Sequence, residues 1–297
     1  MIPGCGTVGM PADVSAFLLS QHFNKAFGSK LFASETCVEK SLPESPSGGT
    51  VASVYHKISR NGLEGLEKDS KAFALSPVKP AYLTGEPQPG MPTETDVIRE
   101  TESFLGRTSA FGIHHSPYFG TAIISPVDDV DRAGVTRAWG LLSKTEFAYS
   151  PNFHYGGTTQ KCANVVQGWI TRAVFKLILF GLASWLGGFL MRFAPQQGGG
   201  ASEAENESEG LLEITAIGVG EKIDGVESRP MASCEWRFRR DPYTFTAIGL
   251  SQAAMVLLED QTEAHRLGGG ILCPSLLGEK YVARLQATGG KIEVKSL

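Results

Sequence analysis

The chain has 297 residues, 42% of them apolar and 20% charged, and its 27 Lys and Arg nearly balance its 31 Asp and Glu. This balance excludes a protein that holds nucleic acid by bulk positive charge, and the apolar content excludes wholesale disorder. The 35 Gly and 16 Pro residues predict many turns rather than a helical bundle. We therefore expect a soluble α/β or α+β protein with no nucleic-acid partner.

The cysteines and the N-terminal residues indicate the cellular compartment in which the protein works. The cysteines stand far apart and form no C-x-x-C pair, which favours neither a disulfide framework nor a thiolate metal site: they are Cys5, Cys37, Cys162, Cys234 and Cys273. Residues 1–6 have neither the basic nor the apolar region of a signal peptide. These features predict a reducing, intracellular environment.

A helix is expected from Pro11 to Phe27, because Pro11 suits a first helical position and Gly28 can close the C-terminus. Its apolar side chains spread wider than an ordinary surface stripe: they are Val14, Phe17, Leu18, Leu19, Phe23 and Phe27. Such a helix needs packing partners on more than one side.

Shorter elements are expected over the next hundred residues, where Gly, Pro and Asp interrupt the apolar runs. The expectations are turns at 39–49, a strand or short helix at 50–58, a long loop with short elements at 64–100, a buried strand at 120–124 and a short helix at 137–143.

The most apolar segment is 173–191, in which Lys176 is the single charged residue. A spanning helix needs about 20 apolar residues, so this length is borderline. Trp169, Trp185 and the flanking arginines suit a membrane interface. Three alternatives remain open, namely a helix that is buried or faces a partner, a helix on a membrane surface, and a membrane span.

The C-terminal part has the clearest periodicity. Residues 195–210 are acidic and of low complexity, which predicts a flexible connection. Apolar and polar residues alternate over 232–239, which predicts a strand with one buried and one solvated face. Further strands are expected at 212–215 and 291–294, and helices at 246–259 and 276–286.

Residues 4–9 read G-C-G-T-V-G and match the dinucleotide-binding fingerprint G-x-G-x-x-G. That fingerprint requires a strand before it and a second strand that ends in an acidic residue. Only three residues precede it here, and residues 24–49 are turn-rich and polar. We therefore expect a strand-to-helix turn of another kind.

No other catalytic motif is present. The adjacent His114 and His115 would point to opposite faces of a strand, which makes a poor metal site. His154 and Tyr155 could transfer protons in a pocket, or they could belong to a loop packed by its own aromatic residues. Both alternatives remain open.

Segments scattered along nearly the whole chain resemble one family. Gly6–Asp13 is similar to the turn G-F-D-S-I-P-A-D, and Ser47–Ser53 to the Gly-Gly-Thr segment, of the saccharopine dehydrogenase-like oxidoreductases, which include the trans-acting enoyl reductases. Where that turn has Asp and Ser, this chain has Val8 and Gly9. The other similar segments are Arg137–Leu142, Tyr149–Tyr155, Asp241–Tyr243, Gln252–Met255, Gly268–Pro274 and the apolar helix.

Members of this family carry an N-terminal Rossmann domain that binds NAD(P), and the resemblance begins after it. It implies an α+β fold with a mixed, largely antiparallel sheet and flanking helices, and no complete Rossmann domain. The implied organisation is a residual strand–helix segment of the cofactor domain at 1–30, a substrate and dimerisation domain at 31–194 that includes the helix 173–191, a flexible linker at 195–210, and returning strands and helices at 211–297. Phe17, Leu18, Phe23 and Phe27 would then lack a partner within this chain.

The resemblance also implies a function. The protein would act on a lipid or polyketide-like substrate, and NAD(P) would be absent or supplied by another chain. Its partners would be a second copy of itself or a complementary cofactor-domain protein, and this chain alone would hold neither cofactor nor metal. The residues assigned to catalysis are His154 and Tyr155, and those assigned to substrate binding are Asp13, Ser53, His56, Arg137 and Asn152.

Two other functions remain open. The first is a cofactor-free isomerase or cyclase that uses the same pocket, for which acid–base chemistry from His154 and Tyr155 would be sufficient. The second is a non-catalytic, membrane-associated binding module in which residues 173–191 contact lipid. The expected location is intracellular, either in the cytoplasm or peripheral on membranes or lipid droplets.

Overall fold

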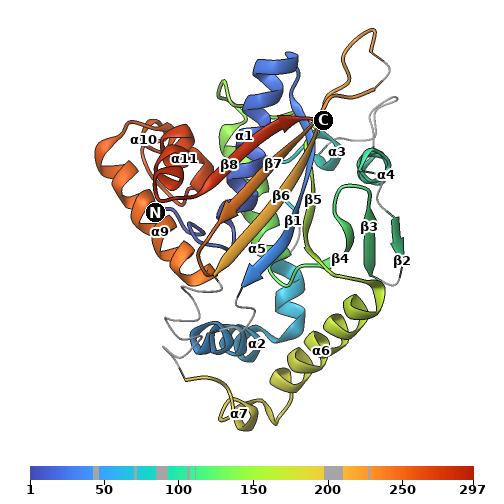
Figure 1. Cartoon of the computed structure of the whole chain (residues 1–297), viewed down its shortest axis with the longest axis vertical. Helices are drawn as coiled ribbons and strands as arrows, with labels where there is room; N and C mark the ends of the chain where they lie inside the picture. Colours follow the sequence, from blue (N-terminus) through green and yellow to red (C-terminus); the bar gives the residue numbers. More distant parts are fainter. Residues whose placement is uncertain are drawn as a thin grey trace.

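The computed structural model describes residues 1–42, 47–69, 72–84, 93–105, 108–110, 112–196, 210–226 and 228–297. Within these residues the chain forms one open eight-stranded sheet in the order β2-β3-β4-β5-β1-β6-β7-β8 (Figure 1). Strands β1 and β5 pair in parallel and the other neighbours are antiparallel. The predicted α+β fold with a mixed, largely antiparallel sheet is therefore confirmed.

The strands and helices have the following bounds. The strands are β1 Leu31–Leu42, β2 Thr108–Ala110, β3 Ile113–Ser116, β4 Gly120–Ile124, β5 His154–Lys161, β6 Leu211–Gly220, β7 Met231–Phe238 and β8 Lys291–Ser296. The helices are α1 Met10–Phe27, α2 Gly48–Asp69, α3 Ala81–Thr84, α4 Glu94–Phe104, α5 Asp128–Leu142, α6 Val165–Ala183, α7 Gly187–Leu190, α9 Pro242–Glu259, α10 Glu263–Arg266, η1 Pro274–Leu277 and α11 Gly278–Ala287.

The main core lies on one face of the sheet, where α1 packs against β1, β6 and β7, α5 against β5, and α11 against β8 and α9. A smaller core lies on the other face, where Val97 and Leu105 from the α4 segment contact residues of β1 and β6. Side chains of β6 alternate between these cores, because Leu212 and Ile214 belong to the first whereas Ile217 and Val219 belong to the second.

Helix α1 packs inside this chain, which corrects one expectation. Phe17 is 2% exposed and Phe23 is fully buried, and Leu18 and Phe27 pack against the same core. The ring of Phe23 lies so close to Gly218 of β6 that a Cβ atom there would be 2.9 Å from it. The expectation that these four residues lack a partner in this chain is therefore wrong. The sheet of this chain covers the wide apolar surface of the helix.

Strand β7 confirms the predicted alternation. Cys234, Trp236 and Phe238 face the main core, whereas Glu235 and Arg237 are exposed. Salt bridges cross the solvated face of the sheet between β7 and its neighbours, from Arg237 to Glu213 and from Lys295 to Glu235. This face therefore needs no covering layer near β7.

Several boundaries differ from the sequence-based expectation. Residues 50–58 lie in α2, and the expected loop at 64–100 contains the helix α4. Thr93 caps α4 by accepting a hydrogen bond from Asp96 N, while the Asp96 carboxylate accepts one from Thr93 N. Helix α9 begins at Pro242, earlier than predicted, because buried Asp241 accepts hydrogen bonds from the first-turn backbone. Most of the expected linker at 195–210 lies outside the described residues.

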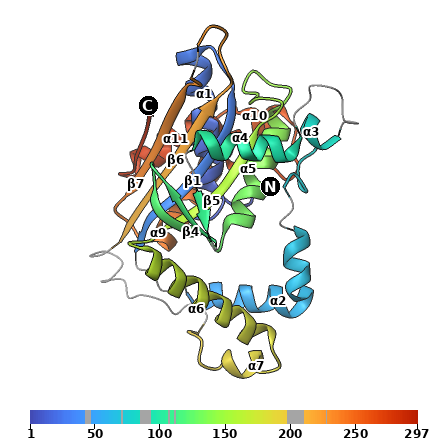
Figure 2. The same ribbon diagram turned by 90° about the vertical axis from the view of Figure 1, so that its right-hand side faces the viewer.

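Helices α6 and α7 project from the sheet domain, and α2 lies beside them (Figures 1 and 2). We call residues 165–193, which comprise α6 and α7, the arm. The arm is fastened at its base, where Gly168 packs against Ile123 and Arg172 donates a hydrogen bond to Gly112 O. Among the described residues, the first part of α6 thus attaches the arm to the sheet at β3 and β4.

The packing of α1 predicts the cost of truncating its buried ring. Phe23→Ala should lower the free energy of unfolding by about 3–5 kcal/mol, because a fully buried aromatic side chain is lost and a cavity remains. Phe27→Ala, at the half-buried end of the same helix, should cost clearly less. Urea unfolding of the two variants measures both effects. Equal and small losses would mean that α1 does not pack on this sheet in solution.

Candidate functional site

Two carboxylates are buried where α1 and α5 meet the sheet. Asp13, in the first turn of α1, accepts hydrogen bonds from Ser275 N at 2.8 Å and from Ser275 Oγ at 2.9 Å. Asp131, in the first turn of α5, accepts from Gly9 N at 2.7 Å and from Thr158 Oγ1 at 2.6 Å. Each aspartate therefore uses both of its carboxylate oxygens.

Burial controls the titration of this pair. Loss of hydration raises the pKa of Asp13 to about 7, and the nearby charge of Asp131 adds to that rise. Loss of hydration likewise raises the pKa of Asp131 to about 7, assisted by the charge of Asp128. Hydrogen bonds from Ser275 and Thr158 oppose the two rises. Both carboxyl groups therefore change protonation near neutral pH.

A polar network extends from Asp131 to β5. The hydroxyl of Tyr155 lies 2.8 Å from Thr158 Oγ1, which itself donates to Asp131. Asp128 accepts from Thr158 N at 2.6 Å and forms a 3.1 Å salt bridge with Arg132. Tyr155 is 1% exposed, and burial raises the pKa of its hydroxyl well above the usual value. Its hydroxyl therefore stays protonated at neutral pH.

The same region contains polar atoms with no partner. Among the described residues, Ser34 Oγ, Tyr149 OH and Asn152 Oδ1 are buried and make no hydrogen bond. Ser34 lies directly beside Tyr155 in the parallel pairing of β1 and β5. Unpaired buried polar groups are uncommon in native proteins and often mark water or ligand positions. This polar cluster therefore has hydrogen-bonding capacity that the fold itself does not use.

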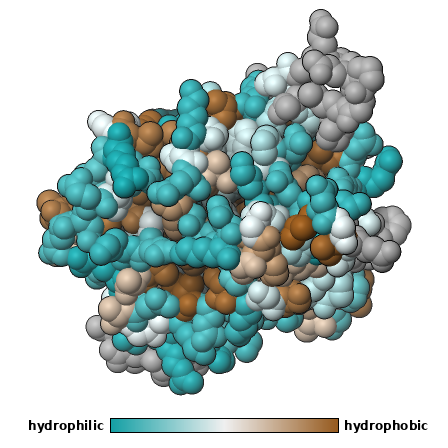
Figure 3. Space-filling model, turned by 90° about the horizontal axis from the view of Figure 1, so that it is seen from above, coloured by the Kyte–Doolittle hydropathy of each residue, from teal (hydrophilic) through white to brown (hydrophobic). Residues whose placement is uncertain are grey.

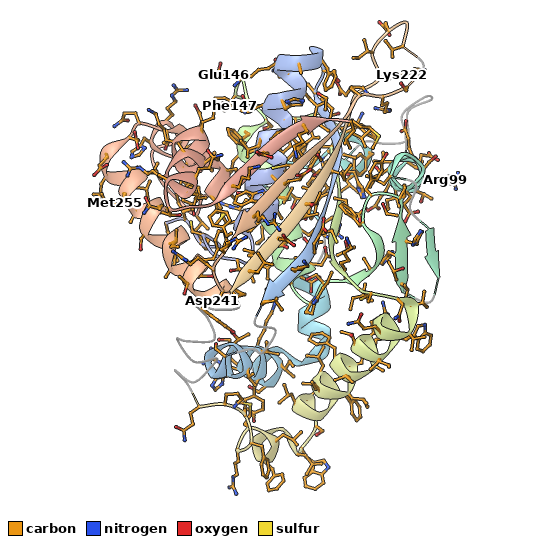
Figure 4. All side chains as sticks on the ribbon, in the orientation of Figure 1. Arg99, Glu146, Phe147, Lys222, Asp241 and Met255 are labelled. Carbon is orange, nitrogen blue, oxygen red and sulfur yellow. The ribbon has the colours of Figure 1, made fainter. Side chains whose placement is uncertain are left out.

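The glycine-rich turn before α1 is packed rather than open. A Cβ at Gly6 would lie 2.7 Å from Thr246 Cγ2, and a Cβ at Gly249 would lie 2.2 Å from Cys5 O. The hydroxyl of Thr7 donates to Pro242 O, and the backbone N–H of Thr7 donates to Thr246 Oγ1. The glycines thus permit close contact with α9, whose capping residue Asp241 is labelled in Figure 4. These residues do not fit a dinucleotide.

The structure brings together only part of the predicted site. Asp13 belongs to the buried carboxylate pair, and Tyr155 to the hydrogen-bonded network that extends from Asp131. Asn152 and His154 are half-buried next to it in the chain, His154 as the first residue of β5. Arg137 serves the fold, because its guanidinium donates to the carbonyls of Ile271 and Leu75. Ser53 and His56 are exposed on α2 beside the arm.

A pocket of about 310 Å³ lies between α2 and the end of the arm. His56, one of the predicted residues, contributes to its wall. The lining residues are Gly48, Ala52, Tyr55, His56, Met191, Arg192, Ala194, Pro195 and Gln196. This pocket is separate from the buried carboxylates, so the predicted substrate-binding residues divide between two places.

The arm exposes a large apolar surface. Helix α6 is long and apolar enough to cross a membrane, and only 11% of its most apolar stretch is buried. Trp185 is 91% exposed, Phe180 70% and Leu177 69%. The other exposed apolar residues of the arm are Val165, Val166, Trp169, Ile170, Val174, Phe175, Ile178, Leu186, Phe189, Leu190 and Phe193. The opposite end of the molecule is mostly hydrophilic, with smaller apolar groups (Figure 3).

Asp131, Thr158 and Ser275 were not among the predicted site residues. A signal for Asp131 exists in the sequence, because it precedes Val135, Ala138 and Leu142 on one apolar stripe of α5. A carboxylate on a core-facing stripe must find partners. Thr158 and Ser275 could not be found in this way, since only the fold places them beside the aspartates.

Comparison with protein-family models, with curated proteins and with solved structures finds no match to this chain. Among the described residues, no group of three or more His, Cys, Asp or Glu side chains could hold a metal ion. The assignment of function therefore depends on the geometry and on the sequence resemblance.

The buried carboxylates predict how stability varies with pH. Since their pKa values are higher in the folded than in the unfolded state, folding retains protons and stability must fall as pH rises from about 5 through 7. Each carboxyl contributes up to about 1.4 kcal/mol per pH unit in this range. Asp13→Asn should flatten the profile, because the amide does not ionise.

Urea unfolding at pH 5, 6, 7 and 8 measures this dependence. Asp224→Asn is the matched control, because Asp224 is exposed in the loop after β6. Subtracting the variant profile from the wild-type profile cancels the contribution of the histidines to the pH dependence of the free energy of unfolding. Identical slopes for the wild type and Asp13→Asn would contradict the assignment of raised pKa values to this pair.

Proposed function

We propose that this chain is a membrane-surface protein of the saccharopine dehydrogenase-like oxidoreductase type, acting on a lipid or polyketide-like substrate. The observation that carries the proposal is the arm, whose apolar side chains are exposed around most of α6 and α7. An apolar surface of this extent on a soluble domain marks an interaction site. Trp169 and Trp185 are exposed on it, and tryptophan favours the boundary between lipid and water.

A surface position in the bilayer fits α6 better than a span does. Lys176 lies near the middle of the helix, where a charged side chain in the hydrocarbon centre costs about 3 kcal/mol. Arg172 is held at the base of the arm by Gly112 O. A helix that lies in the interface keeps such cations in the headgroup layer while its apolar side chains enter the lipid.

The oxidoreductase part of the proposal is supported by how the resembling segments meet. Thr7 in the turn Gly6–Asp13 contacts Pro242, and Asp13 contacts Ser275, directly after Gly268–Pro274. Arg137 holds Ile271 O, and Cys273 donates to Gly134 O on the same helix α5. Segments that are far apart in the sequence therefore gather at the buried carboxylates, as expected for a shared architecture.

NAD(P) in this proposal is bound by another domain or chain, because the turn at residues 4–9 is occupied by contacts with α9. The part this chain supplies is the substrate side, with the arm delivering an apolar molecule from a membrane. A homo-oligomer or a complementary cofactor-domain protein would complete the enzyme.

The arm equally supports the second candidate, a non-catalytic membrane-associated module, since lipid contact requires no chemistry. A cofactor-free isomerase or cyclase has less support, because the hydroxyl of Tyr155 is buried and bonded to Thr158. A general acid or base must come within hydrogen-bond reach of its substrate.

The membrane part predicts that purified protein floats with liposomes and that Leu177→Glu abolishes flotation. Leu177 is 69% exposed, so the substitution should change folding stability by less than about 0.5 kcal/mol while placing a charge in the lipid-facing surface. Leu258→Glu is the matched control, because Leu258 is 80% exposed on α9, outside the arm. Flotation that survives Leu177→Glu would contradict the assignment of the arm to lipid contact.

The oxidoreductase part predicts that NADPH raises the melting temperature of the assembly isolated from its native cell. At 100 times its Kd a ligand adds about 2.7 kcal/mol to the free energy of unfolding. The same NADPH should not shift the melting temperature of the chain alone. If NADPH does not shift the melting temperature of the assembly, the oxidoreductase part is contradicted and the non-catalytic membrane-associated module is the remaining function.

A further inference from the structure

The arm and the first part of its neighbour α2, residues 48–60, carry positive charge without negative charge. From residue 147 to residue 202 the chain has no Asp or Glu, although it has Lys161, Arg172, Lys176 and Arg192. The exposed first part of α2, residues 48–60, contains His56, Lys57 and Arg60 and also lacks acidic residues. The acidic residues of α2 come only after the break at Gly62. The apolar arm is thus bordered by cations.

Contacts on two sides hold the pocket between α2 and the arm in place within this cationic border. The start of α2 is anchored to α9, because Tyr243 OH lies 2.5 Å from Ser47 N and 3.2 Å from Thr50 Oγ1. Gly48 is pressed against the backbone of Pro195 and Gln196, where a Cβ would lie 2.1 Å from Gln196 O. The chain that follows the arm therefore packs on the start of α2 and forms one wall of the pocket.

Two of the groups on the pocket wall can bind an anion. Arg192 and His56 both line the pocket, and Arg192 is exposed directly after α7. Tyr55 supports the wall, since its ring packs against Gly187, where a Cβ would lie 3.1 Å from it. A guanidinium offers paired N–H donors that match the oxygens of a phosphate.

We propose that this pocket binds the phosphate headgroup of an anionic phospholipid while the arm lies in the same leaflet. The inference rests on the proposed membrane function and adds lipid selectivity to it. Arg192 and His56 hold the phosphate, and the exposed side chains of α6 and α7 enter the acyl region next to that headgroup. The volume of about 310 Å³ is at the lower end of the range for small-molecule sites.

Charge complementarity favours a lipid over a second copy of this chain. In a two-fold dimer the same patch meets itself, so the cations of one arm would face those of the other. With no carboxylate on the arm, nothing there would neutralise them. An anionic leaflet supplies the opposite charge, with about 1 kcal/mol gained for each Lys or Arg near the surface.

Sedimentation with vesicles tests the inference on the full chain, using phosphatidylcholine alone and phosphatidylcholine mixed with phosphatidylserine. Wild-type protein should bind the mixed vesicles more tightly. Lys176→Gln removes a charge from the arm outside the pocket, and should weaken binding to mixed vesicles about five-fold. Arg192→Gln should weaken it clearly more, because a direct phosphate contact is also lost. Both losses should be smaller on phosphatidylcholine alone, because the choline ammonium of that lipid balances the charge of its phosphate.

Arg99→Gln is the matched control for charge, since Arg99 is exposed on α4 at the side of the molecule, apart from the arm and α2 (Figure 4). It should bind both kinds of vesicle as the wild type does, and circular dichroism should show that every variant is folded.

The outcomes separate the inference from the proposed function. Equal wild-type binding to both vesicles, or equal losses in Arg192→Gln and Lys176→Gln, would overturn the headgroup site and leave the membrane function intact. No wild-type binding to either vesicle would overturn both. A concentration-dependent dimer that Leu177→Glu abolishes would assign the arm to a second copy and overturn the lipid inference.

Discussion

The burial of two carboxylates at the meeting point of α1, α5 and β5 is the constraint on which the core depends. A charged or polar group removed from water costs several kcal/mol unless it gains hydrogen bonds. Asp13 and Asp131 obtain these bonds from a turn, a strand and a short helix, through Gly9, Thr158 and Ser275. Segments as far apart as residues 13 and 275 must therefore be in place together.

The same constraint explains why a glycine-rich turn precedes a helix here without forming a nucleotide loop. Gly9 adopts a φ of 94°, which favours glycine, and this turns its N–H toward Asp131. Gly6 and Gly249 allow the turn and α9 to approach until no side chain fits between them. Glycines that elsewhere admit a pyrophosphate here admit a helix and a carboxylate. The glycines of this motif allow another group to come close to the backbone, and the surrounding elements determine which group that is.

Local alternation in the sequence predicted β7, whose periodicity matches its burial. The α+β class with a mixed sheet came from the resemblance, since composition alone left α/β and α+β open. Local patterns failed for α4, whose short apolar stripe is hidden among polar residues, and for the packing of α1. The wide apolar surface of α1 does need several packing partners, as predicted, but these partners are β6, β7 and α5 of the same chain. Likewise Asp13 and Tyr155 were predicted, whereas their partners Ser275 and Thr158 depend on tertiary contacts that no local spacing encodes.

Helix α6 of the arm differs from α1, a helix of comparable length, because its apolar residues do little for folding. Helix α6 buries only Gly168 and Leu182, whereas α1 buries most of its length. Exposed Leu177, Phe180 and Trp185 lower solubility and add nothing to the core, so their cost has to be offset by binding. Since the sheet domain is complete without them, the arm can enter a membrane while the buried carboxylates and the strands around them keep their structure. Attachment to lipid and the integrity of the core are thus separable in this fold.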